Sequence, residues 1–166
     1  MNQSIASLVQ TLSELLEKSS IKIALAESCT GGQLAAHLTA QAGSSLWFDR
    51  GFVTYSNASK IESVGVSPSI IEQYGAVSEE VAKAMAQGAL NHSAAKTSIA
   101  ITGIAGPGGS TKNKPVGMVC FAWAVQFPGS PVLLIASTQI FDGDRQAIRE
   151  QACAYALNEL IQILRK

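Results

Sequence analysis

The chain has 166 residues, which is long enough for one domain with a buried core that needs neither disulfides nor a metal ion. Twelve basic residues balance twelve acidic ones and no basic run stands out, so a nucleic-acid partner is not expected. The three cysteines, Cys29, Cys120 and Cys153, are an odd set without CxxC spacing, which argues against a disulfide framework and a zinc site. We therefore expect a single domain over residues 1–166, with no metal and no cofactor.

The N-terminal segment argues against export and against a membrane partner. Its pattern contains Glu14, Glu17 and Lys18, which the apolar centre of a signal peptide would not carry. No segment approaches the roughly 18 uncharged apolar residues that cross a bilayer. We expect a cytoplasmic protein.

The first third of the chain predicts a helix, a strand, a helix and a second strand. Apolar residues at helical spacing indicate an amphipathic helix from Ile5 to about Ser19. The apolar run Ile21 to Ala26 predicts a buried strand, and Thr30 to about Ala40 predicts a helix. The alternating segment Trp47 to Tyr55 predicts a strand, which Ser56-Asn57 ends as a turn or helix cap.

The middle of the chain predicts three helices and a strand that runs into a glycine-rich loop. Short helices are expected over Ser59 to Val64 and Ser69 to Tyr74, and Ser78 begins a longer one that runs to about His92. Ser98 to Thr102 predicts a buried strand, and the loop over residues 103–109 follows it.

The last third predicts two antiparallel strands and a helix. Val116 to Gln126 and Val132 to Ile140 are rich in strand-forming residues and are split by a Pro-Gly-Ser-Pro connection. Asp144 is a suitable cap for the final helix. Because helices bracket and interleave the strands, we expect an α/β fold: a three-layer sandwich with a mixed β-sheet and helices on both faces.

The run Ala26-Glu27-Ser28-Cys29-Thr30-Gly31-Gly32 lies between the first strand and the helix after it. A hydroxyl at such a turn can face a cleft together with the free amides of the first helical turn, which suits a nucleophile beside an oxyanion or anion site. An isolated serine before a helix is more often an N-cap, so both interpretations of Ser28 stay open.

The segment from Tyr55 to Lys60 could supply the base that Ser28 would need. A Ser-Lys pair works when the lysine is partly desolvated, so that a neutral amine can take the serine proton near pH 7. Tyr55 could relay that proton or hold the amine. The alternative for Lys60 is a solvated surface charge.

Other nucleophiles and bases are weaker candidates. Cys29 is a rival nucleophile because a thiol near a helix N-terminus can have a lowered pKa, but a small buried filler is the more common role of a free cysteine. His37 and His92 lie in predicted helices with no matching triad signature.

An anionic group of a substrate could bind at two further places. Backbone amides of the loop 103–109 could hold a phosphate, although a plain connecting loop has the same composition. Arg145 could bind an anion or pair with Asp142 or Asp144.

Five motifs in this order closely resemble those of the CinA-like family, and more narrowly its stand-alone nicotinamide-nucleotide amidases. They are Ala26-Glu27-Ser28-Cys29-Thr30-Gly31-Gly32, Arg50-Gly51-Phe52-Val53-Thr54-Tyr55-Ser56-Asn57, Gly75-Ala76-Val77-Ser78, Thr102-Gly103-Ile104-Ala105-Gly106-Pro107 and Lys114-Pro115-Val116-Gly117. The resemblance runs from about Ser4 to the C-terminus and implies the amidase part alone, without the extra N-terminal domain of longer relatives.

The resemblance implies metal-free hydrolysis of the carboxamide of nicotinamide mononucleotide, giving nicotinic acid mononucleotide and ammonia for recycling into NAD. It implies Ser28 as nucleophile, with Tyr55 and Lys60 as its activating partners. An amide needs an activated hydroxyl, an oxyanion site and an acid for the departing ammonia, and these segments could supply all three. We expect substrate contacts at seven further residues: Thr30, Gly31, Gly32, Thr102, Gly103, Gly106 and Arg145.

Two further expectations complete the hypothesis. A non-catalytic nucleotide-binding module could use the same loops, because a fold and a pocket can outlive catalysis. We also expect a homo-oligomer, most simply a dimer, since dimers are the commonest soluble assemblies.

Overall fold

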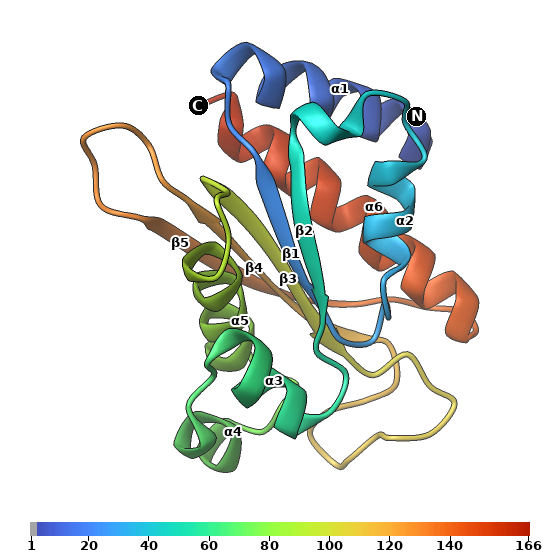
Figure 1. The fold of residues 1–166 in the computed structure, drawn as a ribbon. Helices are drawn as coiled ribbons and strands as arrows, with labels where there is room; N and C mark the ends of the chain where they lie inside the picture. Colours follow the sequence, from blue (N-terminus) through green and yellow to red (C-terminus); the bar gives the residue numbers. More distant parts are fainter. Residues whose placement is uncertain (1–2) are drawn as a thin grey trace.

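The computed structural model describes residues 3–166, in which five strands form one mixed sheet (Figure 1). The sheet order is β2-β1-β3-β4-β5, with β1 parallel to both β2 and β3, and with β4 antiparallel to β3 and β5. The carboxyl ends of β1, β2 and β3 therefore meet at one edge. The strands are β1 (Ile23–Glu27), β2 (Phe48–Val53), β3 (Thr97–Gly103), β4 (Met118–Val125) and β5 (Leu133–Ile140).

Helices cover both faces of the sheet, which confirms the predicted three-layer α/β fold. One face carries α1 (Ile5–Ser19), α2 (Gln33–Thr39) and α6 (Arg145–Leu164). The other carries α5 (Glu79–Asn91), beside which lie α3 (Asn57–Val64) and α4 (Pro68–Tyr74) (Figure 1). A short 3-10 helix, Ser44–Leu46, follows α2. Within the described residues, no helix combines the length and apolarity needed to cross a membrane.

The central strands alternate large and small side chains between the two layers. Leu25, Ile99 and Trp123 pack toward α1 and α6, whereas Ala24 and Ala100 belong to the cluster that packs against α5. This alternation follows from the two-residue period of a strand. The small residues allow α5 to lie close to the sheet, which in turn brings α3 to the edge where the parallel strands end.

Side-chain caps begin α1, α3, α5 and α6, whereas the residues before α2 and α4 supply none. Ser56 accepts a hydrogen bond from the Ser59 amide and begins α3 two residues earlier than predicted. The predicted helix start at Thr30 is wrong because Gly31 and Gly32 have φ values of +56° and +96°, outside the helical region. The helix begins at Gln33 instead, and the intervening residues form a turn.

Candidate active site

Ser28 and Lys60 meet at the edge where the parallel strands end. Ser28 directly follows β1, and its amide donates to the carbonyl of Ile101 on β3 at 2.9 Å. Lys60 lies in the first turn of α3 and extends back to the end of β1. Its Nζ is 3.1 Å from the Ser28 Oγ, and the lysine is only 1% exposed. The predicted pairing is present in the structure, and the alternative of a solvated surface lysine is wrong.

Two main-chain carbonyls hold the Lys60 amine. Its Nζ donates to the carbonyl oxygens of Thr54 at 2.8 Å and Tyr55 at 3.2 Å. Within residues 3–166 no carboxylate forms a salt bridge with it. Burial without a counter-ion disfavours the charged form, so the pKa of Lys60 is lowered from its usual value of 10.5.

This arrangement defines what the neutral amine can do. A neutral amine has two N–H groups and one lone pair, and the two carbonyls occupy the N–H groups. The lone pair is then left to accept the hydroxyl proton of Ser28, which turns to it from the Tyr55 carbonyl, since the Oγ is the third neighbour of the nitrogen. The geometry therefore equips Lys60 to act as a general base toward Ser28.

Cys29 lies beside Ser28 but has a different electrostatic environment. Its side chain is buried, and burial raises the pKa of the thiol to about 12. The thiol is therefore protonated at neutral pH, whereas the thiolate is the reactive form. This favours the buried-filler interpretation of Cys29 over the nucleophilic one.

Tyr55 reaches the pair through its main chain rather than through its hydroxyl. Its carbonyl accepts hydrogen bonds from the Lys60 Nζ at 3.2 Å and from the Ser28 hydroxyl at 3.4 Å. Tyr55 as a residue is 58% exposed, and its hydroxyl oxygen accepts a hydrogen bond of 3.1 Å from Nη2 of Arg145. The Tyr55 side chain thus borders the site on the solvent side.

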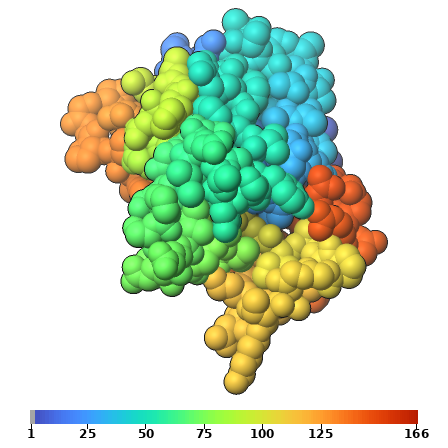
Figure 2. Space-filling model, turned by 60° about the horizontal axis from the view of Figure 1, so that its bottom comes forward, coloured from blue at the N-terminus to red at the C-terminus, as the bar shows by residue number. Residues whose placement is uncertain are grey.

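A cavity of about 300 Å³ opens in front of Ser28 and Lys60. Figure 2 views this end of the molecule, where the loop after β3 (yellow) and the start of α6 (red) lie close to the segment that leads into α3 (teal). The walls include four of the predicted substrate residues, Thr102, Gly103, Gly106 and Arg145, but not Thr30, Gly31 or Gly32. The other lining residues are Ser28, Cys29, Tyr55, Asn57, Lys60, Ala76, Val77, Ile104, Ala105, Gly108 and Gly109.

The amides at the start of α2 do not serve the cavity, and the expectation that they are free for a substrate is wrong. The carboxylate of Glu27, which is 1% exposed, accepts hydrogen bonds from the amides of Gly32, Leu34 and Ala35. These three amides are therefore not free to bind a substrate. Glu27 caps the start of α2, a role that a serine just before the helix often has.

Arg145 joins two walls of the cavity. Its Nη1 donates to the carbonyl of Gly106 at 2.8 Å, and its Nη2 donates to the Tyr55 hydroxyl. Among the described residues it forms no salt bridge with Asp142 or Asp144, so the ion-pair interpretation is wrong. Thr102 lines the cavity, but its hydroxyl donates to the carbonyl of Ala76.

Four functional candidates were missed in the sequence. Asn57, Ala76 and Val77 line the cavity, although the motifs around them gave no reason to assign a role. Arg149 of α6 binds the carbonyls of Cys29 and Thr30 at 3.1 and 3.0 Å. No local sequence signal joins residues 120 positions apart.

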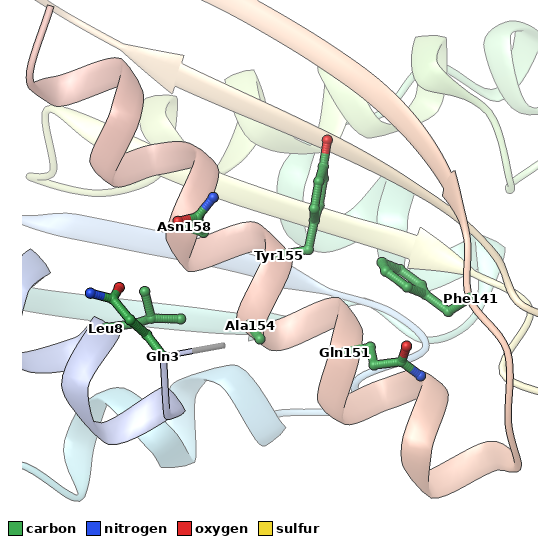
Figure 3. A pocket seen from close by; sticks show the side chains of 7 residues that line it. All are labelled: Gln3, Leu8, Phe141, Gln151, Ala154, Tyr155 and Asn158. Carbon is green, nitrogen blue, oxygen red and sulfur yellow. The ribbon is translucent and has the colours of Figure 1, made fainter. Parts of the chain in front are cut away.

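A larger cavity, of about 530 Å³, lies elsewhere, between α1 and α6. In Figure 3 its lining side chains are amides, apolar groups and Tyr155, with no serine, cysteine, lysine or carboxylate. The larger cavity is lined by Gln3, Leu8, Phe141, Gln151, Ala154, Tyr155 and Asn158. Size alone therefore does not identify the reactive site.

No metal site is found within residues 3–166 either. In the part of the chain that is described, no three His, Cys, Asp or Glu residues form a group that could hold a metal ion.

Fold and site together define a class: a three-layer α/β protein with a buried Ser-Lys pair at the carboxyl edge of its parallel strands. The sequence matches the model of the CinA C-terminal domain over residues 5–164, and the chain belongs to this family.

Named relatives and a solved structure agree with this membership. The nicotinamide-nucleotide amidohydrolase PncC of Enterobacter agglomerans is 49% identical over 140 residues, covering 84% of this chain and 83% of that protein. The protein of the same name from Escherichia coli K12 is 46% identical over 155 residues, covering 93% and 92%. The crystal structure of competence/damage inducible protein CihA from Agrobacterium tumefaciens superposes with a TM-score of 0.89 at 39% identity and covers 100% of both chains.

Proposed function

We propose that this protein hydrolyses the carboxamide of nicotinamide mononucleotide to nicotinic acid mononucleotide and ammonia. Relatives at 46–49% identity that align over most of both chains are named nicotinamide-nucleotide amidohydrolases. The observation that carries the proposal in this chain is the 3.1 Å contact between Ser28 Oγ and the buried Lys60 Nζ, since an unactivated amide needs such a nucleophile.

In the first half of the reaction, the neutral Lys60 amine takes the Ser28 proton while the Oγ attacks the carboxamide carbon. A C–O bond forms, the carbonyl oxygen becomes an oxyanion, and Lys60 becomes an ammonium. That ammonium then protonates the amide nitrogen, the C–N bond breaks and ammonia leaves. The product of this half-reaction is an ester between Ser28 and the nicotinoyl group.

In the second half, a water molecule replaces ammonia. Lys60, again neutral, removes a proton from the water, and the hydroxide attacks the ester carbon. The C–O bond to Ser28 breaks, and Lys60 returns the proton to the Oγ. The carboxylic acid formed in this way loses its proton to solvent, and the carboxylate product departs. The hydrogen bonds from Lys60 to the carbonyls of Thr54 and Tyr55 keep its nitrogen in place through both halves.

The cavity beyond the Ser-Lys pair would hold the ribose phosphate. Arg145 offers a guanidinium at the cavity wall, and Gly103 and Gly106 keep the loop backbone free of side chains. A phosphate dianion would replace the Tyr55 hydroxyl and the Gly106 carbonyl as the acceptor of the Arg145 hydrogen bonds. A guanidinium binds phosphate more strongly than it binds a neutral oxygen. Tyr55 would then border the ribose rather than transfer a proton.

The test is ammonia release by purified, chelator-treated protein from three substrates: nicotinamide mononucleotide, nicotinamide and the dinucleotide NAD. We expect turnover of the mononucleotide, with equimolar nicotinic acid mononucleotide, and much slower release from free nicotinamide, which lacks the phosphate. Equal rates for nicotinamide and its mononucleotide would refute a nucleotide-selective site. Absence of turnover in a protein that binds the mononucleotide would leave a binding module.

A further inference from the structure

The turn that carries the nucleophile is held from the sheet side by hydrogen bonds of its own backbone. The Ser28 amide donates to Ile101 on β3, and the Gly31 amide donates back to the Ser28 carbonyl at 3.0 Å. The Gly32 amide donates to Glu27 at 3.2 Å. These contacts fix the two ends of the turn, but its middle residues, Cys29 and Thr30, form no hydrogen bond with β3 or with Glu27.

Arg149 holds the middle of the turn from the opposite side. Its Nε donates to the Cys29 carbonyl at 3.1 Å and its Nη2 donates to the Thr30 carbonyl at 3.0 Å. Within residues 3–166 the guanidinium forms no salt bridge. The half-buried positive charge of Arg149 is therefore hydrogen-bonded to main-chain carbonyls and not to a carboxylate. A guanidinium fork on two successive carbonyls fixes orientation as well as distance, because it has two parallel donors.

Two amides of this turn, those of Cys29 and Thr30, donate to no other residue in the described part of the chain. Of these two residues, Cys29 lines the cavity next to Ser28 and Thr30 does not, and the Cys29 N–H lies near its own thiol. Buried main-chain amides are rarely unpaired. In acyl transfer, the amide of the residue that follows the nucleophile is a common donor to the oxyanion.

We propose that Arg149 is a positioning residue of this reaction: by binding the Cys29 and Thr30 carbonyls, it orients the turn so that the Cys29 amide stabilises the oxyanion. This inference rests on the proposed amidase function and names a part of the site that the Ser-Lys pair does not supply. Burial and Glu27 raise the thiol pKa of Cys29, whereas Arg149 and Arg145 lower it, so the Arg149 guanidinium is one of the charges that favour an anion at this turn.

The first test is Arg149→Ala, with Arg165→Met as control, because Arg165 lies exposed at the C-terminal end of the same helix and does not line the cavity. We expect kcat for the mononucleotide to fall by about 10- to 1000-fold, in the range for loss of one oxyanion donor, with KM changed less than about threefold. Guanidinium ion added to Arg149→Ala should restore part of kcat with saturation, and it should not restore Ser28→Ala.

A second variant covers the case in which Arg149→Ala does not fold. Arg149→Lys keeps the charge but cannot bind both carbonyls as a fork, so kcat should still fall while KM and the pH at which Lys60 titrates stay unchanged. Unchanged kcat in either folded variant, or a rise in KM alone, would overturn the positioning role. If the protein is not an amidase, the parent itself will be inactive. Failure of the proposed function can therefore be told apart from failure of the positioning role, which requires an active parent.

Discussion

Lys60 is the residue on which the chemistry depends, because its nitrogen is buried without a counter-ion. Because the pKa of Lys60 is lowered, its ammonium loses a proton at a lower pH than an ordinary lysine, whose pKa is 10.5. As pH rises through the pKa, the neutral base accumulates. We therefore expect kcat/KM to increase with pH, with slope about one on a logarithmic scale, and to level off below pH 10.5.

The matched variant for this pH profile is Lys60→Arg, which keeps a positive charge but cannot become a base at accessible pH. It should lose the rising limb together with at least about 100-fold of kcat. A parent profile that is flat between pH 6 and 10, measured with a stable enzyme, would contradict a titrating lysine base.

Cys29 provides a second prediction at this scale. Since its thiol is buried and its pKa is about 12, it should resist iodoacetamide at pH 7.5 in the folded protein. Cys29→Ala keeps the main-chain amide and should retain kcat within about threefold, as expected for a side chain outside the chemistry. Loss of most activity, with an unchanged melting temperature, would instead make the thiol a participant.

Among the elements, α2 depends on a carboxylate that precedes it by several residues. Glu27 accepts three amide hydrogen bonds at the start of this seven-residue helix. Glu27→Gln should lower the free energy of unfolding by about 1–3 kcal/mol, since hydrogen bonds to an ionised acceptor are the stronger kind. Urea denaturation measures this, with the exposed Glu72→Gln as control; equal stability of both variants would disprove the capping role.

The contact between α5 and α3 sets the place of Lys60. At Gly88 of α5, an added Cβ would lie 1.9 Å from the Val64 carbonyl oxygen at the end of α3. Gly88→Ala must push α3 away, so we expect about 1–3 kcal/mol of destabilisation and a fall in kcat. Lys83→Ala, on the exposed side of the same helix, should leave both unchanged. A fully stable and active Gly88→Ala would show that α3 can shift without consequence.

The elements were largely predictable from sequence, because caps and hydrophobic periods are local. Ser56, Ser78 and Asp144 begin their helices with the side-chain bonds that the pattern indicates. Local patterns could not reveal that Glu27 would use the α2 amides or that Arg149 would bind a turn 120 residues away. Both depend on the tertiary approach of separate segments.

For the whole molecule, the sheet order explains why the site lies where it does. Three parallel strands end at one edge, and the first turn of α3, the loop after β3 and the start of α6 converge there (Figures 1 and 2). Residues from four of the five motifs line one cavity together with Lys60 and Arg145, whereas the motif at residues 114–117 does not reach it. Resemblance to the CinA-like family anticipated Ser28 and Lys60 together, whereas composition alone left Lys60 as a surface charge.

The predicted assembly can be checked at the same scale. One sheet covered by helices on both faces should unfold in a single cooperative transition, as small single domains do. We expect light scattering after gel filtration to give twice the monomer mass, as for a homodimer. A monomer at micromolar concentration would contradict the predicted dimer. Two separate unfolding transitions would contradict the single cooperative unit.

The account depends most on Ser28 being a nucleophile activated by Lys60, and one comparison tests this directly. Binding of nicotinamide mononucleotide by calorimetry and ammonia release would be measured for the parent, Ser28→Ala and Lys60→Ala. We expect all three to bind with similar Kd, while both variants lose at least about 1000-fold of kcat. Turnover by folded Ser28→Ala at close to the parent rate would contradict the mechanism and move the nucleophile elsewhere.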